Sequence, residues 1–135
     1  MSLCSPRRTE VEIARGHATL GELIGVAPRH FRPPWGMVNA AMWRALERTA
    51  ERCVFWSLQP EGLWARSAEA QAAYVVKRAG AGAIVDLHDA EGVAGAPARL
   101  AAALPAMLDG LSDAGYRLTT VADLLGDTQA SGTRA

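Results

Sequence analysis

Helix-like and strand-like segments alternate along this chain, and this alternation constrains its fold more than any other feature. In the helix-like segments, apolar residues recur three or four positions apart, and Ser, Pro or Gly stands at the ends. We expect helices at residues 6–24, 38–49, 68–78, 97–114 and 121–125. The expected apolar faces are Ile13, Leu20 and Ile24 in the first helix, and Leu100, Leu104, Met107, Leu108 and Leu111 in the fourth.

Four short apolar segments lie between these helices and predict strands. They are "RHFRP" at residues 29–33, "RCVFWSL" at 52–58, "AIVDLH" at 83–88 and "YRLTTV" at 116–121. Strands separated by helices are typical of a parallel sheet. The predicted fold class is therefore α/β, with about four parallel strands.

The composition fits one globular domain and argues against several classes of partner. The chain has 135 residues, 50% of them hydrophobic, and its formal net charge is zero. It has neither a long run of like charges nor an apolar run of the roughly 20 residues that span a bilayer, so we expect no nucleic-acid partner and no membrane partner. The N-terminus has no leader pattern, so we expect the chain as written to be cytoplasmic. Residues 1–125 should form the domain, and residues 126–135 should form a disordered polar tail.

Some reactive and aromatic residues are expected to have structural roles. The two cysteines are too few for a disulfide framework and lack the spacing of a metal site. We expect Cys4 and Cys53 to be unpaired thiols, with Cys53 buried in a strand. We expect Trp43 and Trp56 to be packing residues, and His17 and His30 to be solvated or structural histidines.

Polar and aromatic residues follow three of the predicted strands. "FRPPWG" begins at the end of the first strand, "WSLQPEGLW" follows the second, and "HDAEG" follows the third. In open parallel sheets, ligands bind beyond the carboxyl ends of the strands. We therefore expect Arg32, Trp35 and His88 to lie on one rim and to face a site.

The order of "FRPPWG", "VFWSLQPEGLW", "GAIVDLHD" and "GYRLTTVADLL" resembles the C-terminal half of the polysaccharide deacetylase family, also called the NodB homology domain or carbohydrate esterase family 4. The resemblance covers residues 7–125. It implies a partial (β/α) barrel of the glycoside hydrolase and deacetylase type. It also implies a carbohydrate or acylated amino sugar as partner, and hydrolysis of acyl groups with a divalent metal, often zinc.

The resemblance implies a role for each residue of the expected site. Arg32 would orient the carboxylate that acts as general base, because a guanidinium matches a carboxylate in geometry. His88 would be the general acid that protonates the leaving nitrogen. Trp35 would form a wall of the sugar groove. Pro34, Leu87 and Trp64 are the other residues expected to contact substrate.

The chain departs from the family pattern in three places. The family has an aspartate directly before its tryptophan, but Leu63 precedes Trp64 here, so Glu61, Asp86 or Asp89 could be the partner of His88. Asp86 also replaces a leucine that commonly lines the acyl pocket. The T-F-D-D-G and H-[ST]-x-x-H motifs, which supply the base and the metal ligands, are absent. We expect no metal site and no cofactor in this chain alone.

Three hypotheses account for these absences. The chain is a fragment of a longer deacetylase, through a misplaced start at Met1 or a truncated gene. Alternatively, it is a noncatalytic carbohydrate-binding or interaction module, or a half-barrel that a partner chain completes. Exposed sheet edges in a half-barrel would favour self-association.

Overall fold

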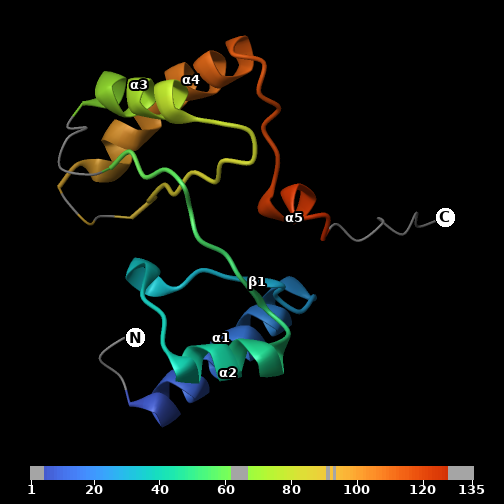
Figure 1. Cartoon of the computed structure of the whole chain (residues 1–135). Helices are drawn as coiled ribbons and strands as arrows, with labels where there is room; N and C mark the ends of the chain where they lie inside the picture. The colour runs from blue at the N-terminus through green and yellow to red at the C-terminus, as the bar shows by residue number, and fades with distance from the viewer. Residues whose placement is uncertain (1–4, 62–66, 91, 93, 128–135) are drawn as a thin grey trace. The chain divides into compact units, whose positions relative to one another are not determined.

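Two compact units make up the chain, Met1–Phe55 and Trp56–Ala135. The structure is a computed structural model that describes residues 5–61, 67–90, 92 and 94–127 (Figure 1). Within these residues, no helix has both the length and the apolar character needed to cross a bilayer. The predicted tail at residues 126–135 lies almost entirely outside the described residues, so its disorder stays a prediction.

The N-terminal unit is built on two packed helices, α1 (Pro6–Ile24) and α2 (Ala40–Thr49). The Ser5 side chain accepts a hydrogen bond from the backbone N–H of Arg8, and Gly25 ends α1 with φ 73°. Both features were predicted from the sequence. The core between the helices consists of Ile13, Met42, Ala45 and Leu46, with Phe31 and Cys53 packed against it.

A short parallel sheet lies beside these helices. Strand β1 (His30–Phe31) pairs with β2 (Arg52–Cys53), and Phe31 stands opposite Cys53 in the register. A 3₁₀ turn, η1 (Pro34–Gly36), follows β1 directly. The sheet therefore holds the start of "FRPPWG" against the core, and the turn carries the rest of it away from the strand.

The C-terminal unit contains α3 (Ala68–Arg78), α4 (Ala96–Asp113) and the short α5 (Val121–Leu124). These positions confirm the predicted helices at 68–78, 97–114 and 121–125 to within a residue at most ends. The buried core is shared by α3 and α4 and consists of Ala72, Val75, Leu100, Ala103, Met107 and Leu111.

The strand predictions were wrong in extent. Only residues 30–31 and 52–53 form strands in the described part of the chain. The predicted strand at 83–88 contributes one parallel bridge, between Val85 and Leu58. Residues 116–120 form no strand, although "YRLTTV" was expected to be one. A strand needs a partner for its ladder of hydrogen bonds, and the sequence pattern of a segment does not provide that partner.

The helix predictions need smaller corrections. Helix α2 begins at Ala40, after the capping residue Asn39, so Val38 lies outside it. Leu20 and Ile24 are 51% and 58% exposed, and Leu108 on α4 is 46% exposed. These three residues therefore do not belong to the buried faces of their helices, whereas the small residues Ala45 of α2 and Ala103 of α4 are buried. Cys53 is a free thiol and only half-buried.

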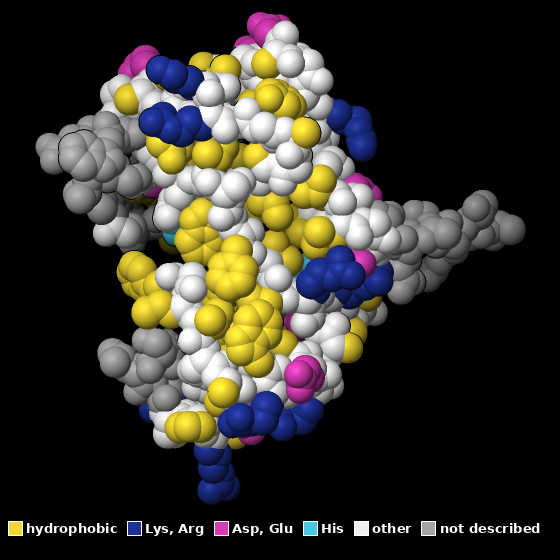
Figure 2. Space-filling view, in the orientation of Figure 1, with side chains coloured by type: hydrophobic (Ala, Val, Ile, Leu, Met, Phe, Trp, Pro, Cys, Tyr) yellow, Lys and Arg dark blue, Asp and Glu magenta, His cyan; other side chains and the backbone are white. Residues whose placement is uncertain are grey.

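Hydrophobic side chains are also abundant on the surface, as Figure 2 shows for one face. Those most exposed in the N-terminal unit are Trp35, Leu23, Ile24, Val11 and Val26. Singly exposed apolar residues are normal, but Trp35 is 86% exposed, which is unusual for so large an aromatic group.

Candidate functional site

His88 lies between two carboxylates in the C-terminal unit. Its ring Nδ1 is hydrogen-bonded to Oε2 of Glu61, and its backbone N–H donates to Oε1 of the same carboxylate at 2.8 Å. On the other side of the ring, Nε2 lies 3.8 Å from Oδ2 of Asp86. The His88 side chain is 53% exposed, whereas those of Glu61 and Asp86 are 11% and 8% exposed. A mostly buried carboxylate thus holds one edge of an accessible imidazole.

Adjacent backbone segments bring these residues together. Leu58 and Val85 form the parallel bridge, and the backbone N–H of Asp86 donates to the Leu58 carbonyl at 2.9 Å. His88 and Glu61 follow this bridge on their respective segments. Of the three carboxylates considered from the sequence, Glu61 is the one bonded to Nδ1. Asp89 is exposed.

The "FRPPWG" residues belong to the N-terminal unit. Arg32 and Pro34 are exposed, and Pro33 between them is fully buried. Trp35 has φ 60° and ψ 14°, the left-handed conformation that a bulky side chain rarely adopts. The backbone N–H of Gly36 donates to the Pro33 carbonyl at 3.0 Å, which closes the turn that imposes this conformation. The turn therefore holds the indole out in solvent at some cost in backbone strain.

The predicted site residues are distributed over both units. Arg32, Pro34 and Trp35 lie in the first, and Leu87 and His88 in the second. Leu87 is half-buried and packs against the α3–α4 core. Trp64 lies outside the described residues. The expected placement of Arg32, Trp35 and His88 on one rim stays a prediction, because each unit is defined by itself.

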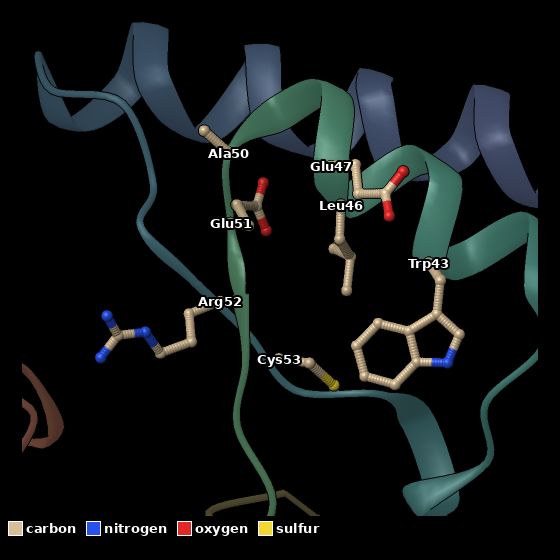
Figure 3. A pocket seen from close by; sticks show the side chains of 7 residues that line it. All are labelled: Trp43, Leu46, Glu47, Ala50, Glu51, Arg52 and Cys53. Atoms are coloured by element: carbon tan, nitrogen blue, oxygen red, sulfur yellow. The ribbon is translucent and has the colours of Figure 1, made fainter.

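An open surface pocket that sequence reasoning missed lies beside β2 (Figure 3). Its volume is about 510 Å³, and it is lined by Trp43, Leu46, Glu47, Ala50, Glu51, Arg52 and Cys53. Figure 3 shows the Cys53 thiol and the Trp43 indole pointing into the same space below Leu46, whereas the Arg52 side chain extends away. Burial raises the pKa of the Cys53 thiol, so the thiol is not activated as a nucleophile. The sequence analysis gave Trp43 a packing role only. In the structure its side chain lines this pocket and is 43% exposed.

His17 and His88 are already bonded to carboxylates. His17 on α1 binds Glu51, with 2.5 Å between Nδ1 and Oε1, and His88 binds Glu61. An open hydrolytic metal site needs three protein ligands. Among residues 5–61, 67–90, 92 and 94–127, no group of three or more His, Cys, Asp or Glu side chains could hold a metal ion. The donor set of the described residues therefore does not fit the divalent metal that the family implies.

Comparison with known proteins gives the class of this chain. Its structure is similar to a family 4 carbohydrate esterase from Streptomyces lividans in complex with acetate, with a TM-score of 0.77 and 25% identity over 90% of this chain and 59% of that one. It is also similar to the Xyl-CE4 domain of a multidomain xylanase from the hindgut metagenome of Trinervitermes trinervoides, with a TM-score of 0.78, 24% identity, and coverage of 93% and 58%. The fold is thus that of part of a family 4 carbohydrate esterase.

The sequence agrees with this class. The chain is 36% identical over 100 residues to a peptidoglycan-N-acetylglucosamine deacetylase of Bacillus cereus. The alignment covers 73% of this chain and 46% of that relative, so the chain matches about half the length of the curated protein. No protein-family model matches the chain. The chain carries part of a domain of the polysaccharide deacetylase family, as its motifs predicted.

Proposed function

We propose that this chain is the C-terminal part of a hydrolase that removes acyl groups from amide or ester positions of carbohydrates, and that it is inactive alone. The observation that carries the proposal is the accessible imidazole of His88, held at Nδ1 by a mostly buried carboxylate. The similarity to a peptidoglycan-N-acetylglucosamine deacetylase supports the same chemistry. Inactivity follows from the absent T-F-D-D-G and H-[ST]-x-x-H motifs.

His88 is the general acid in this proposal. Hydrolysis of an N-acyl group passes through a tetrahedral carbon, and the C–N bond breaks more easily when the nitrogen receives a proton. The protonated ring donates the hydrogen on Nε2 to that nitrogen and returns to the neutral form. Nε2 is suited to this step because Glu61 occupies the other ring nitrogen.

Trp35 and Arg32 supply substrate contact and orientation. Trp35 has a strained left-handed backbone. Residues in such strained conformations cluster at functional sites, so the strain supports a functional role for the exposed indole. An indole face suits a sugar ring, so Trp35 forms a wall of the groove, and Pro34 and Trp64 contribute to it. Arg32 orients the catalytic carboxylate that the missing motif would supply.

The exposed indole also favours a second candidate function. A carbohydrate-binding module without catalysis needs an aromatic surface and no metal, and Trp35 is 86% exposed. A half-barrel completed by a partner chain would use the same residues as the enzyme. Catalysis by a completed domain would therefore exclude the binding module and would agree with both the fragment and the completed half-barrel.

The test is a fusion. The N-terminal part of the Bacillus cereus deacetylase, up to the start of its alignment with this chain, is joined to the 135 residues. We expect metal-dependent acetate release from a chitooligosaccharide by the fusion and none by the chain alone. In the fusion, His88→Ala should lower kcat by roughly 10²- to 10⁴-fold at unchanged metal content, because general acid catalysis contributes about that much.

Controls distinguish the candidate functions. Asp109→Asn changes one exposed carboxylate on α4 and should leave both kcat and metal content unchanged. A folded, metal-loaded fusion that binds the oligosaccharide without releasing acetate would favour the binding module. Wild-type kcat in the His88→Ala fusion would refute the general-acid role.

A further inference from the structure

We propose that Glu61 is the positioning residue for His88, fixing its neutral imidazole as the tautomer with hydrogen on Nδ1. The use of this tautomer in catalysis rests on the proposed function, whereas the tautomer itself does not. Glu61 lies 27 positions before His88 in the chain, and the family's aspartate before tryptophan is absent here. The sequence alone left Glu61, Asp86 and Asp89 as possible partners, and the hydrogen bonds select Glu61.

The backbone explains why a side chain holds His88. In a parallel ladder, alternate N–H groups of one strand donate to the neighbouring strand. Asp86 N–H donates to the Leu58 carbonyl at 2.9 Å, so the next N–H directed to that side is that of His88. Its acceptor is Oε1 of Glu61, at 2.8 Å, rather than a backbone carbonyl. The Glu61 side chain thus extends the ladder by one step, just beyond the fully buried Pro60.

The second carboxylate oxygen determines the tautomer. An ionised carboxylate only accepts hydrogen bonds, so its bond to Nδ1 requires hydrogen on Nδ1. In the neutral ring, Nε2 then carries a lone pair, and it can take up a proton and later donate it. Because both Glu61 oxygens bind the same residue, ring rotation would break the bond to Nδ1 while the backbone bond remained.

The nearby acidic residues do not have the same geometry. Asp86 Oδ2 lies 3.8 Å from Nε2, beyond hydrogen-bonding distance, and on the side of the ring that faces the proposed substrate. Asp89 directly follows His88 in sequence and is exposed. Glu61 is thus the carboxylate whose removal should change the tautomer, and Asp89 supplies a matched control.

The experiment measures the tautomer in the 135-residue chain with ¹⁵N-labelled histidine. Two-bond ¹H–¹⁵N correlation spectra distinguish the two neutral tautomers, and His88→Ala identifies the His88 signals. At a pH where the ring is neutral, we expect hydrogen on Nδ1 in the wild type. The His17 ring, bonded to Glu51, is an internal reference that changes at Glu61 should not affect.

Glu61→Gln separates a tautomer-setting role from a structural one. The glutamine oxygen can still accept from the His88 backbone N–H, so the ladder is retained. Its NH₂ group then faces Nδ1 and must donate, which reverses the ring to the tautomer with hydrogen on Nε2. Asp89→Asn removes the same charge one residue from His88 and should leave the wild-type tautomer.

Two results would overturn the proposal: a wild-type ring with hydrogen on Nε2, or the same tautomer in wild type and Glu61→Gln. In the active fusion, Glu61→Gln should lower kcat at least about tenfold with little change in KM, because it affects proton transfer and not substrate contact. A reversed tautomer with unchanged kcat would uphold Glu61 as positioning residue but refute His88 as general acid. The two proposals therefore fail separately.

Discussion

At the scale of single residues, Glu10 links the two helices of the N-terminal unit. Its carboxylate binds Arg48 of α2 at 2.7 Å and Arg44 at 3.2 Å. Burial acts to raise the pKa of the Glu10 carboxyl, but the hydrogen bonds and charges of Arg48 and Arg44 together outweigh it, and the pKa lies below its ordinary value. The ionised form is therefore favoured by folding.

This lowered pKa predicts how pH affects the stability of the N-terminal unit. A carboxyl whose pKa is lower in the folded state contributes stability above its unfolded pKa, about 4.3 for glutamate, and loses it as pH falls through the folded value. Wild type should thus exceed Glu10→Gln in urea midpoint at pH 7, and the difference should shrink towards pH 3. Urea titrations of both proteins at several pH values measure this.

The control is Glu22→Gln, at an exposed position on α1. Its difference from wild type should vary little with pH. High salt should also reduce the effect of Glu10, since the ion pairs are partly exposed. A wild-type advantage over Glu10→Gln that grows as pH falls would contradict the prediction.

The sequence identified His88 as a candidate but could not choose its partner. The position of His88 at the end of an apolar run is visible locally. Glu61 is distant in sequence, and its selection over Asp86 and Asp89 depends on how the segments around Leu58 and Val85 align. Trp35 shows the same limit, because its motif is evident but its left-handed backbone results from the closed turn.

At the scale of elements, the sequence predicted helices better than strands. A helix is bounded by residues close in sequence, such as Ser67, whose side chain accepts from Ala70 N–H at 3.1 Å. A strand depends on a partner far along the chain. "YRLTTV" has the composition of a strand, but residues 116–120 have no strand pairing in the structure. Propensity alone therefore overstated the sheet.

The contact between α3 and α4 gives a prediction at this scale. A Cβ added at Gly110 on α4 would lie 2.7 Å from Cγ2 of Val76 on α3. Valine is stiff about χ1, so it cannot easily move aside. Gly110→Ala should reduce the free energy of unfolding by about 0.5–2 kcal/mol, as overpacking outweighs the gain in helix propensity. Thermal unfolding followed by circular dichroism measures the change.

Two further variants make this prediction specific. Val76→Ala should be less harmful in the Gly110→Ala background than in wild type, because it removes the clash. Gly16→Ala on α1, where a Cβ would meet nothing within 4 Å, should stabilise by about 0.5–1 kcal/mol. If Gly110→Ala stabilised the protein as much as Gly16→Ala, the prediction would be wrong. That result would show that α3 and α4 can move apart at Val76 without a loss in the free energy of unfolding.

At the scale of the whole molecule, the chain combines a family's fold with an incomplete set of its chemical groups. The structural match to the Streptomyces lividans esterase covers 90% of this chain but only 59% of the esterase. The motif that ends in His88 is present, as are the arginine and the tryptophan of "FRPPWG". The motifs for the base and the metal ligands are absent. Under the proposed function, whatever completes the site has to supply both.

The distribution of histidines leads to a prediction about metal binding. His17, His30 and His88 lie on α1, on β1 and after the Val85 bridge, and His17 and His88 are bonded to carboxylates. Binding zinc would require breaking such bonds and gathering ligands from separate elements. In calorimetry, the chain alone should show no stoichiometric zinc site of micromolar or better affinity, about 8 kcal/mol. The fusion with the Bacillus cereus segment should bind one zinc per molecule, and His88→Ala should not weaken that binding. Stoichiometric micromolar binding by the chain alone would show that its own side chains rearrange into a metal site.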